Sequence, residues 1–191
     1  MWVLYIVGQL SVSPLQCSHP AIAKAINDCR TNLADLKREV VFLLMGVPAS
    51  EAEFTDVDLK YALRLCLVMA AEESFQREIK ALRQRAPIPR DSVLRNVNPY
   101  IDPADDILKV NGRLEHTPLA ESARHPVIIS PDHHLASLII NQAHVNAQHA
   151  GMEYKITKFR TKYYLLRRRR AVRKVIARSP VASTIRCPVN R

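Results

Sequence analysis

Two segments repeat apolar residues at helical intervals, and they constrain the fold more than any other feature of the chain. In residues 20–45 the intervals alternate between four and three, which places one apolar stripe along a helix. The stripe consists of Ile22, Ile26, Cys29, Leu33, Leu36, Val40 and Leu43. Pro20 suits a first helical turn, and Gly46 and Pro48 end the pattern. We expect one long core helix over 20–45, with a self-association surface as the alternative.

A second helical pattern runs from Asp56 to about Arg85. Its stripe is formed by Leu59, Leu63, Cys66, Leu67 and Ala70. We expect the two helices to pair as a helical hairpin, because each has an apolar stripe that the other can cover. Residues 51–104 are thus predicted to be a connector helix followed by a proline-containing linker. The linker spans 86–106, and its part from Ser92 to Ile101 is expected to be extended.

A small antiparallel sheet is predicted after the linker. Asn111 and Gly112 lie between two apolar runs, and this pair favours a tight turn, so residues 107–115 are expected to form a hairpin. The run 127–129 can add a third strand. The predicted fold class is therefore mainly α with a small antiparallel β-sheet. Three aspartates in the preceding turn, Asp102, Asp105 and Asp106, are expected to serve turn formation rather than catalysis.

Three further helices are expected near residues 132–146, 152–162 and 168–178, giving a compact helical domain over 105–182. Asp132 is the expected cap of the first, with His133 and His134 exposed at its start. Residues 163–166 are expected to be a short extended connection. The tail 183–191 is expected to be disordered.

Positive charge is concentrated at the C-terminal end. The chain of 191 residues carries a net charge of +10, yet residues 155–191 hold thirteen Lys or Arg and no Asp or Glu. This asymmetry predicts a polyanionic partner, DNA or RNA, that is held without reading its sequence. The candidate binding residues are Lys158, Arg160, Lys162, Arg167, Arg168, Arg169, Arg170, Arg173, Lys174 and Arg178. Tyr163 and Tyr164 either fill the core, which we favour, or stack on bases.

His144 and His149 lie at the end of the predicted helix 132–146, where two imidazoles can converge on one metal ion. A closed zinc site needs two further ligands, commonly cysteines. Ser179 and Ala182 have the spacing of such a pair but no thiols. The segments ILKVNGRLE, ARHPVIISPDHHLASLII, HVNAQHAG and AVRKVI resemble, in this order, the His-His-Cys-Cys zinc-binding domain of retroelement integrases, closest to the BEL/Pao retrotransposons.

The resemblance covers roughly residues 58–182 and is strongest from Ile107. It implies that His144 and His149 are zinc ligands and that cysteines stand in the family at positions 179 and 182. It implies zinc as the cofactor, and the two replacements predict weak or absent zinc binding in this chain. The replacements also suggest a truncated or degenerate copy of such an element.

By this resemblance, the chain is a non-catalytic nucleic-acid-binding module of an integrase, serving DNA integration. Strand transfer in that family needs a separate core with three metal-binding carboxylates, and this sequence does not supply one. A phosphate-binding glycine loop and a nucleophile elbow are missing too, so we expect no enzyme activity and no small-molecule substrate. The alternative function is a protein-interaction or oligomerisation fragment of a degenerate retroelement polyprotein.

Cysteine usage and hydropathy indicate the compartment. Cys17, Cys29, Cys66 and Cys187 show no framework spacing, which favours free thiols in a reducing environment. The opening MWVLYIVGQL lacks a basic segment and a cleavage site, and no run approaches the roughly 20 apolar residues of a membrane span. We expect an intracellular protein, in the cytoplasm, the nucleus or both, that is neither secreted nor membrane-bound.

Overall fold

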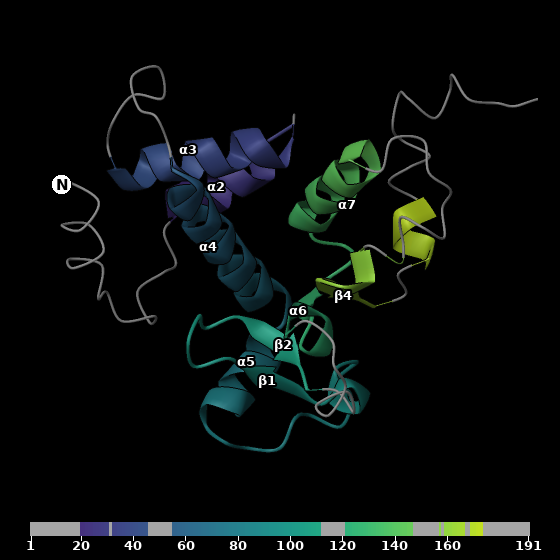
Figure 1. The fold of residues 1–191 in the computed structure, drawn as a ribbon. Coiled ribbons are helices and arrows are strands. Elements are labelled where there is room, and N and C mark those ends of the chain that lie inside the picture. The colour runs from purple at the N-terminus through teal and green to yellow at the C-terminus, as the bar shows by residue number, and fades with distance from the viewer. Residues whose placement is uncertain are drawn as a thin grey trace, which may run out of the picture.

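Helices make up most of the described chain, and a small sheet lies beside them (Figure 1). The computed structural model describes residues 20–30, 32–45, 55–111, 121–146, 157, 159–166 and 169–173. The prediction of a mainly α fold with a small sheet is confirmed. The predicted disordered tail 183–191 lies outside these residues.

The segment predicted as one helix over 20–45 is two helices, α2 (Pro20–Asp28) and α3 (Leu33–Met45). Asn32 separates them, because its side-chain oxygen accepts the backbone N–H groups of Ala34 at 2.8 Å and Asp35 at 2.9 Å. An asparagine that caps a new helix competes with continuation of the old one. The single-helix prediction is wrong, and the unbroken apolar spacing persists because both helices face the same core.

The apolar stripe of α2 and α3 is buried inside the protein. Ile26 on α2 is 1% exposed, and Leu36 and Val40 on α3 are 0% exposed. Ile22, Cys29, Leu33 and Val40 are buried in the same cluster, and Leu43 is partly buried against it. The core-helix interpretation is confirmed, and this stripe is not available as a self-association surface.

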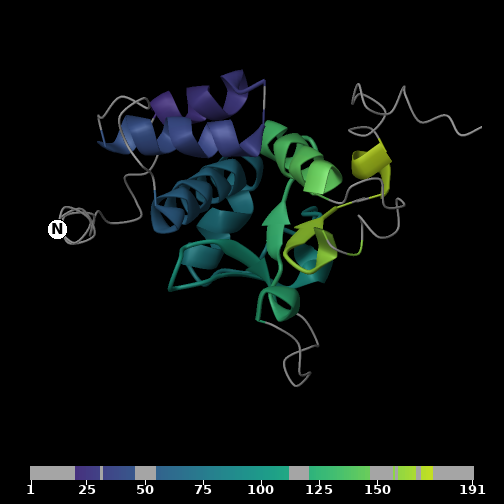
Figure 2. The same ribbon diagram turned by 45° about the horizontal axis from the view of Figure 1, so that its top comes forward.

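The second predicted helix is also divided, into α4 (Asp56–Ser74) and α5 (Gln76–Arg83). Thr55 and Asp58 form a reciprocal capping box at the start of α4. Phe75 leaves the helical conformation, with φ −134° and ψ 36°, while its side chain is 5% exposed. The single-helix prediction fails here because burial of Phe75 redirects the chain. α3 packs against α4, as expected of paired helices (Figures 1 and 2).

Four short strands form one sheet in the order β1 (Pro99–Ile101), β2 (Leu108–Val110), β3 (Val127–Ile129) and β4 (Tyr163–Leu165). β1 and β2 are antiparallel, as are β2 and β3, but β3 and β4 are parallel. The sheet is therefore mixed rather than antiparallel. The predicted extended connection at 163–166 is largely a strand, joined to β3 through the helix α7 (His134–Asn146), as parallel neighbours require.

The linker and the hairpin differ from expectation. The predicted linker contains the short 3-10 helix η2 (Arg95–Val97) and all of β1, so it belongs to the folded structure. β2 is flanked by β1 and β3. The second arm predicted for the hairpin, residues 113–115, lies in a gap between the described segments. A short helix, α6 (Glu121–Arg124), leads into β3.

Both faces of the sheet are covered (Figure 2). Successive residues of β3 and β4 alternate between two apolar clusters, as strand geometry dictates. Ile129 and Leu165 join the cluster of α2, α3, α4 and α7, whereas Ile128 lies in the cluster that contains Phe75 and Ile79. This double burial positions β4, and the basic residues next to it, firmly in the fold.

The three aspartates before β2 form a turn, as predicted. The carboxylate of Asp102 accepts the N–H of Ala104 at 2.9 Å, and that of Asp105 accepts the N–H of Ile107 at 3.1 Å. The Lys109 ammonium donates to both carboxylates, at 2.7 Å to Asp105. These carboxylates are thus committed to local hydrogen bonds and to one cation.

Cations of α4 and α5 hold the rest of this turn. Arg64 Nε donates to the carbonyl of Asp105 at 2.6 Å. Arg83 pairs with Asp106 at 3.3 Å and with Glu72 at 2.9 Å. Asp106 has φ 57°, a left-handed conformation that aspartate tolerates better than most residues. These contacts give the turn a structural role.

We expect Lys109→Met to lower the free energy of unfolding by about 1–3 kcal/mol, because it leaves two half-buried carboxylates without their cation. The hydrogen bond from Lys109 is the main reason that the pKa of Asp102 is lowered. Burial alone would lower the pKa of Lys109, but its bonds to Asp102 and Asp105 leave it raised. The measurement is urea unfolding as a function of pH.

The two pKa directions fix where this stabilisation acts. A carboxyl group whose pKa is lowered by folding stabilises the protein at pH values above its unfolded pKa, near 3.9. This stabilisation is lost as the pH falls below that value. A lysine whose pKa is raised by folding stabilises the protein below its unfolded pKa, about 10.4. This stabilisation is lost as the pH rises above that value. Below a pH of about 4, the free energy of unfolding of Lys109→Met should therefore depend less on pH than that of the unaltered chain. The control Lys60→Met removes the exposed pair with Asp56, and should change stability by less than about 0.5 kcal/mol. Equal losses in both variants would contradict the prediction.

Candidate nucleic-acid interface

The structure describes five of the ten predicted binding residues, and all five are exposed. They are Arg160, Lys162, Arg169, Arg170 and Arg173. Lys158, Arg167, Arg168, Lys174 and Arg178 lie outside the described residues. The exposure predicted for the basic segment is thus confirmed where it can be seen.

Buried apolar neighbours hold these cations at the surface. Phe159 is 5% exposed, and the turn after it is closed by a hydrogen bond from Lys162 N–H to the Phe159 carbonyl, at 3.1 Å. Beyond β4, residues 169–173 are helical, with Ala171 and Val172 buried in the first cluster. A helix that buries these two adjacent residues turns the arginines on either side outward.

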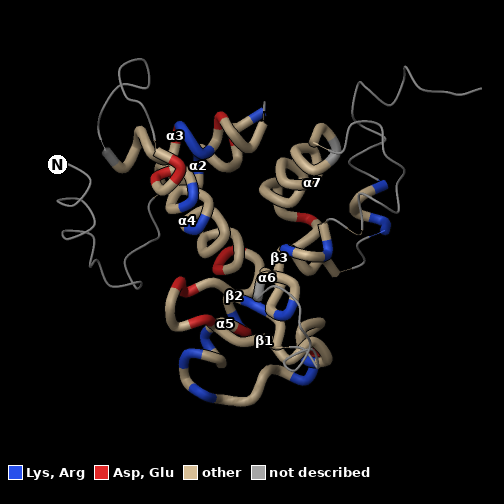
Figure 3. The backbone as a smooth tube through the Cα atoms, in the orientation of Figure 1, with Lys and Arg blue, Asp and Glu red and all other residues tan. Residues whose placement is uncertain are grey.

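The basic segment differs from the rest of the protein in that no acidic residue lies among its cations, with thirteen Lys or Arg and no Asp or Glu in residues 155–191. Elsewhere, some cations are matched with nearby acids, as in Lys60 with Asp56 and Arg83 with Glu72, whereas others, such as Lys24 and Arg38, form no ion pair with a described acid. In the basic segment, Arg160, Lys162, Arg170 and Arg173 form no ion pair with any acidic residue that the structure describes. Figure 3 shows the helical turn 169–173 as a basic region set apart from the acidic residues. Uncompensated charge of this kind attracts phosphates.

The two tyrosines of β4 fill the core. Tyr163 is half-buried against the first cluster, with its ring centroid 5.2 Å from that of Phe159, and burial raises its pKa. Tyr164 is packed against the second cluster. Their expected core role is confirmed, so the described part of the interface offers charge and not aromatic stacking.

Parallel pairing relates the basic segment to a cation that the sequence did not single out. Val127 N–H donates to the Lys162 carbonyl at 3.0 Å, so β3 and β4 start from the same end of the sheet. α6 ends at the half-buried Arg124, just before β3. Arg124 therefore lies near the same end of the sheet as Lys162. The sequence signal that could have indicated this pairing is the helical pattern between the apolar runs 127–129 and 163–165, which is typical of parallel strands.

The predicted metal ligands lie outside the side chains that the structure describes. His144 lies on α7, but its side chain, with His149, Ser179 and Ala182, lies beyond what the structure describes. No group of three or more His, Cys, Asp or Glu side chains in the described ranges is arranged to hold a metal ion. The donor set named by the resemblance does not fit zinc, because alanine offers no ligand and a serine hydroxyl is a poor one.

We expect zinc titration of the purified chain to show no tight equivalent, because two imidazoles alone leave the coordination shell open. The double substitution Ser179→Cys and Ala182→Cys should create a tight one-to-one site if the resemblance holds. Isothermal titration of both proteins is the measurement. Tight binding by the unaltered chain would contradict the prediction, and Ser179→Ala serves as the control.

His133 and His134 are not the exposed residues predicted for the start of α7. His133 Nδ1 accepts the Leu135 N–H at 3.1 Å, so His133 rather than Asp132 caps the helix. Its Nε2 lies 3.2 Å from the Glu73 carboxylate on α4, and the side chain is 8% exposed. His134 Nε2 donates to the Cys29 carbonyl at 2.7 Å. These bonds fasten α7 to α4 and to the end of α2.

Two of the predicted free cysteines are also in the core. Cys29 and Cys66 are buried thiols without a disulfide, as expected. Burial raises the pKa of Cys66 to about 12, so this thiol is unreactive in the folded protein.

Comparison with known proteins gives no family assignment. No family model matches the chain, no curated protein sequence matches it, and no solved structure matches it. Among the helices that the structure describes, none is both long enough and apolar enough to span a membrane. The functional conclusion therefore rests on the geometry and charge of the chain itself.

Proposed function

We propose that this chain is a non-catalytic nucleic-acid-binding module that holds DNA or RNA by its phosphates. The observation that carries this proposal is the concentration of positive charge: residues 155–191 hold thirteen Lys or Arg and no Asp or Glu, and Arg160, Lys162, Arg170 and Arg173 among them are exposed. Unmatched cations bind phosphates by releasing condensed counterions, and this needs no base-specific contact.

The setting we propose is retroelement integration, on the strength of the sequence resemblance. The module corresponds to the connector and the zinc-binding-like N-terminal domain of an integrase, which acts beside a separate catalytic core. The basic segment supplies DNA contact there, and the chain itself carries no catalysis and no small-molecule site. Free buried thiols suit the reducing environment of the cytoplasm or nucleus.

The experiment is a fluorescence anisotropy titration with labelled DNA and RNA duplexes of unrelated sequence. Because contact is to phosphates, the dissociation constants should agree within about fivefold among sequences, against the 10³-fold or more typical of specific sites. Failure to bind any of them at low ionic strength would overturn the proposal. A strong preference for one sequence would replace it with base-specific recognition.

A protein-interaction or oligomerisation fragment is the second proposal. Phe42 and Leu44, near the end of α3, are 36% and 37% exposed, which favours an apolar contact there. The helical stripe first considered for this role is buried in the core. Light scattering separates the two proposals, since a stable dimer that ignores nucleic acid supports the second alone.

A further inference from the structure

The exposed cations that the structure describes in the basic segment fall into two groups at the two ends of strand β4. Arg160 and Lys162 precede the strand directly and form the first group. Arg169, Arg170 and Arg173 follow it on the helical turn 169–173 and form the second group. Figures 1 and 2 show this turn beyond one end of β4, with the short helical piece around residue 160 at the other end.

The strand keeps the two groups apart. Leu165 is buried in the first cluster, and β4 is hydrogen-bonded to β3 along its length, so the connection cannot fold back. The strand alone separates its ends by roughly 7 Å, at about 3.3 Å per residue. The seven steps from Lys162 to Arg169 reach at most about 25 Å. Both groups therefore hold their positive charges at fixed positions, between roughly 7 and 25 Å apart.

This separation selects among anions. Along the axis of a stacked, helical strand, phosphates follow one another at about 3.4 Å, so bridging the two groups takes roughly three to eight of them. A free phosphate or a mononucleotide reaches one group at a time. A longer chain reaches both, and its second contact forms at a high effective concentration.

We propose that the basic surface is a two-point clamp for a linear polyanion, with Arg160 and Lys162 as one contact and the 169–173 turn as the other. The inference rests on the proposed function and adds a minimum ligand length to it. Affinity should rise abruptly once an oligonucleotide spans both groups. Below that length, each group binds independently and weakly.

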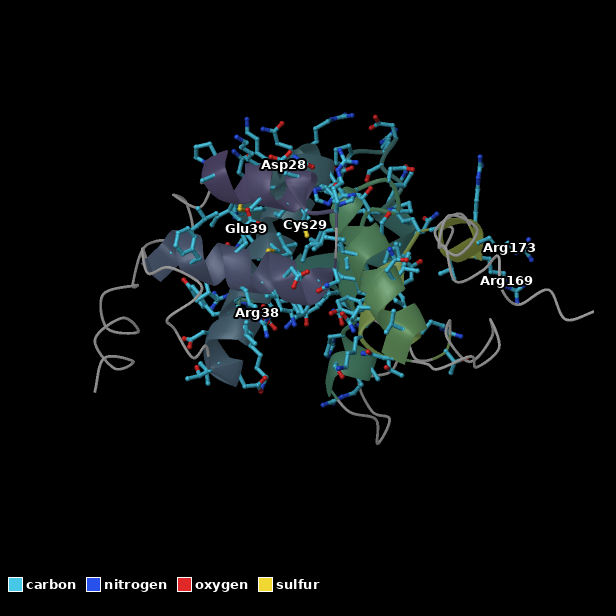
Figure 4. All side chains as sticks on the ribbon, turned by 90° about the horizontal axis from the view of Figure 1, so that it is seen from above. Asp28, Cys29, Arg38, Glu39, Arg169 and Arg173 are labelled. Carbon is cyan, nitrogen blue, oxygen red and sulfur yellow. The ribbon has the colours of Figure 1, made fainter. Side chains whose placement is uncertain are left out.

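The test is a length series of labelled single-stranded oligonucleotides, from about two to about sixteen nucleotides, around the expected threshold. Three variants accompany the unaltered chain. One carries Arg160→Gln with Lys162→Gln, and the second carries Arg170→Gln with Arg173→Gln. The control carries Lys24→Gln with Arg38→Gln, two exposed residues of α2 and α3. Figure 4 shows Arg38 on α3, at the other side of the molecule from Arg169 and Arg173.

In the unaltered chain and the control, we expect a rise of about tenfold or more between roughly three and eight nucleotides. Either interface variant should lose this step and bind long oligonucleotides about 10- to 50-fold more weakly. A smooth increase with length in the unaltered chain would overturn the clamp while leaving nucleic-acid binding intact. An interface double variant that keeps the abrupt rise in affinity would likewise overturn the clamp while leaving nucleic-acid binding intact. Absence of binding at every length at low ionic strength would overturn the proposed function and the clamp together.

Discussion

Leu36→Ala is expected to lower the free energy of unfolding by about 2–5 kcal/mol, the usual cost of emptying a fully buried leucine site. Leu36 lies on α3 with 0% of its surface exposed, in a cluster shared with α4 and α7. The neighbouring helices are tied through His133 and His134, which limits how far they can collapse into the cavity. The measurement is chemical denaturation followed by circular dichroism.

The control for this substitution is Leu44→Ala on the same helix. Leu44 is 37% exposed, and its truncation should cost less than about 1 kcal/mol because little buried surface is removed. A similar loss in both variants would show that helix propensity, and not the shared core, sets the effect.

Leu36→Ala also tests how the protein divides into domains. The first cluster runs from Ile22 to Val172, across the boundary predicted near residue 104. We expect one cooperative transition, with residues 105–182 losing structure together with α3. The buried thiol of Cys66 reports the same event, since it reacts with alkylating reagents only on unfolding. A separate, unshifted transition for the C-terminal part would indicate two independent domains.

Removing four cations should nearly abolish nucleic-acid binding. The variant combines Arg160→Gln, Lys162→Gln, Arg170→Gln and Arg173→Gln, all at exposed positions. Each lost phosphate contact costs close to one decade of affinity at about 0.1 M salt. Since cations elsewhere in the basic segment remain, we expect a loss on the order of 10²- to 10³-fold, measured by anisotropy with a duplex.

The fold should survive these four changes, because none of the residues is buried or paired with a described acid. Denaturation midpoints should agree with those of the unaltered chain. The Lys24→Gln and Arg38→Gln control removes charge from the opposite side and should weaken binding by less than about threefold. An equal loss in control and variant would indicate diffuse attraction instead of a localised surface.

Apolar spacing predicted the helices but not their breaks. Stripes such as Ile26 to Leu36 remain continuous across two helices, because periodicity records which face is buried and not whether the backbone is unbroken. The two helix breaks depend on single residues. Asn32 caps α3, and the side chain of Phe75 is buried in the second cluster between α4 and α5. A side-chain cap and a tertiary contact leave little trace in a periodic pattern.

The parallel strand β4 was harder to foresee. Its three residues resemble a connection, and only the hydrogen bonds to β3 define it as a strand. The same pairing explains why Tyr163 and Tyr164 fill two different clusters. The exposure of the cations, in contrast, could be predicted from charge density alone. Contacts such as that of His134 with Cys29, distant in sequence, could not.

The central claim is that unmatched cations around β4 hold phosphates, and the salt dependence of duplex binding tests it most directly. If Arg160, Lys162, Arg170 and Arg173 each neutralise one phosphate, the logarithm of the binding constant should fall against the logarithm of salt concentration with a slope of about −3.6 or steeper. A slope close to zero, with measurable binding, would contradict it.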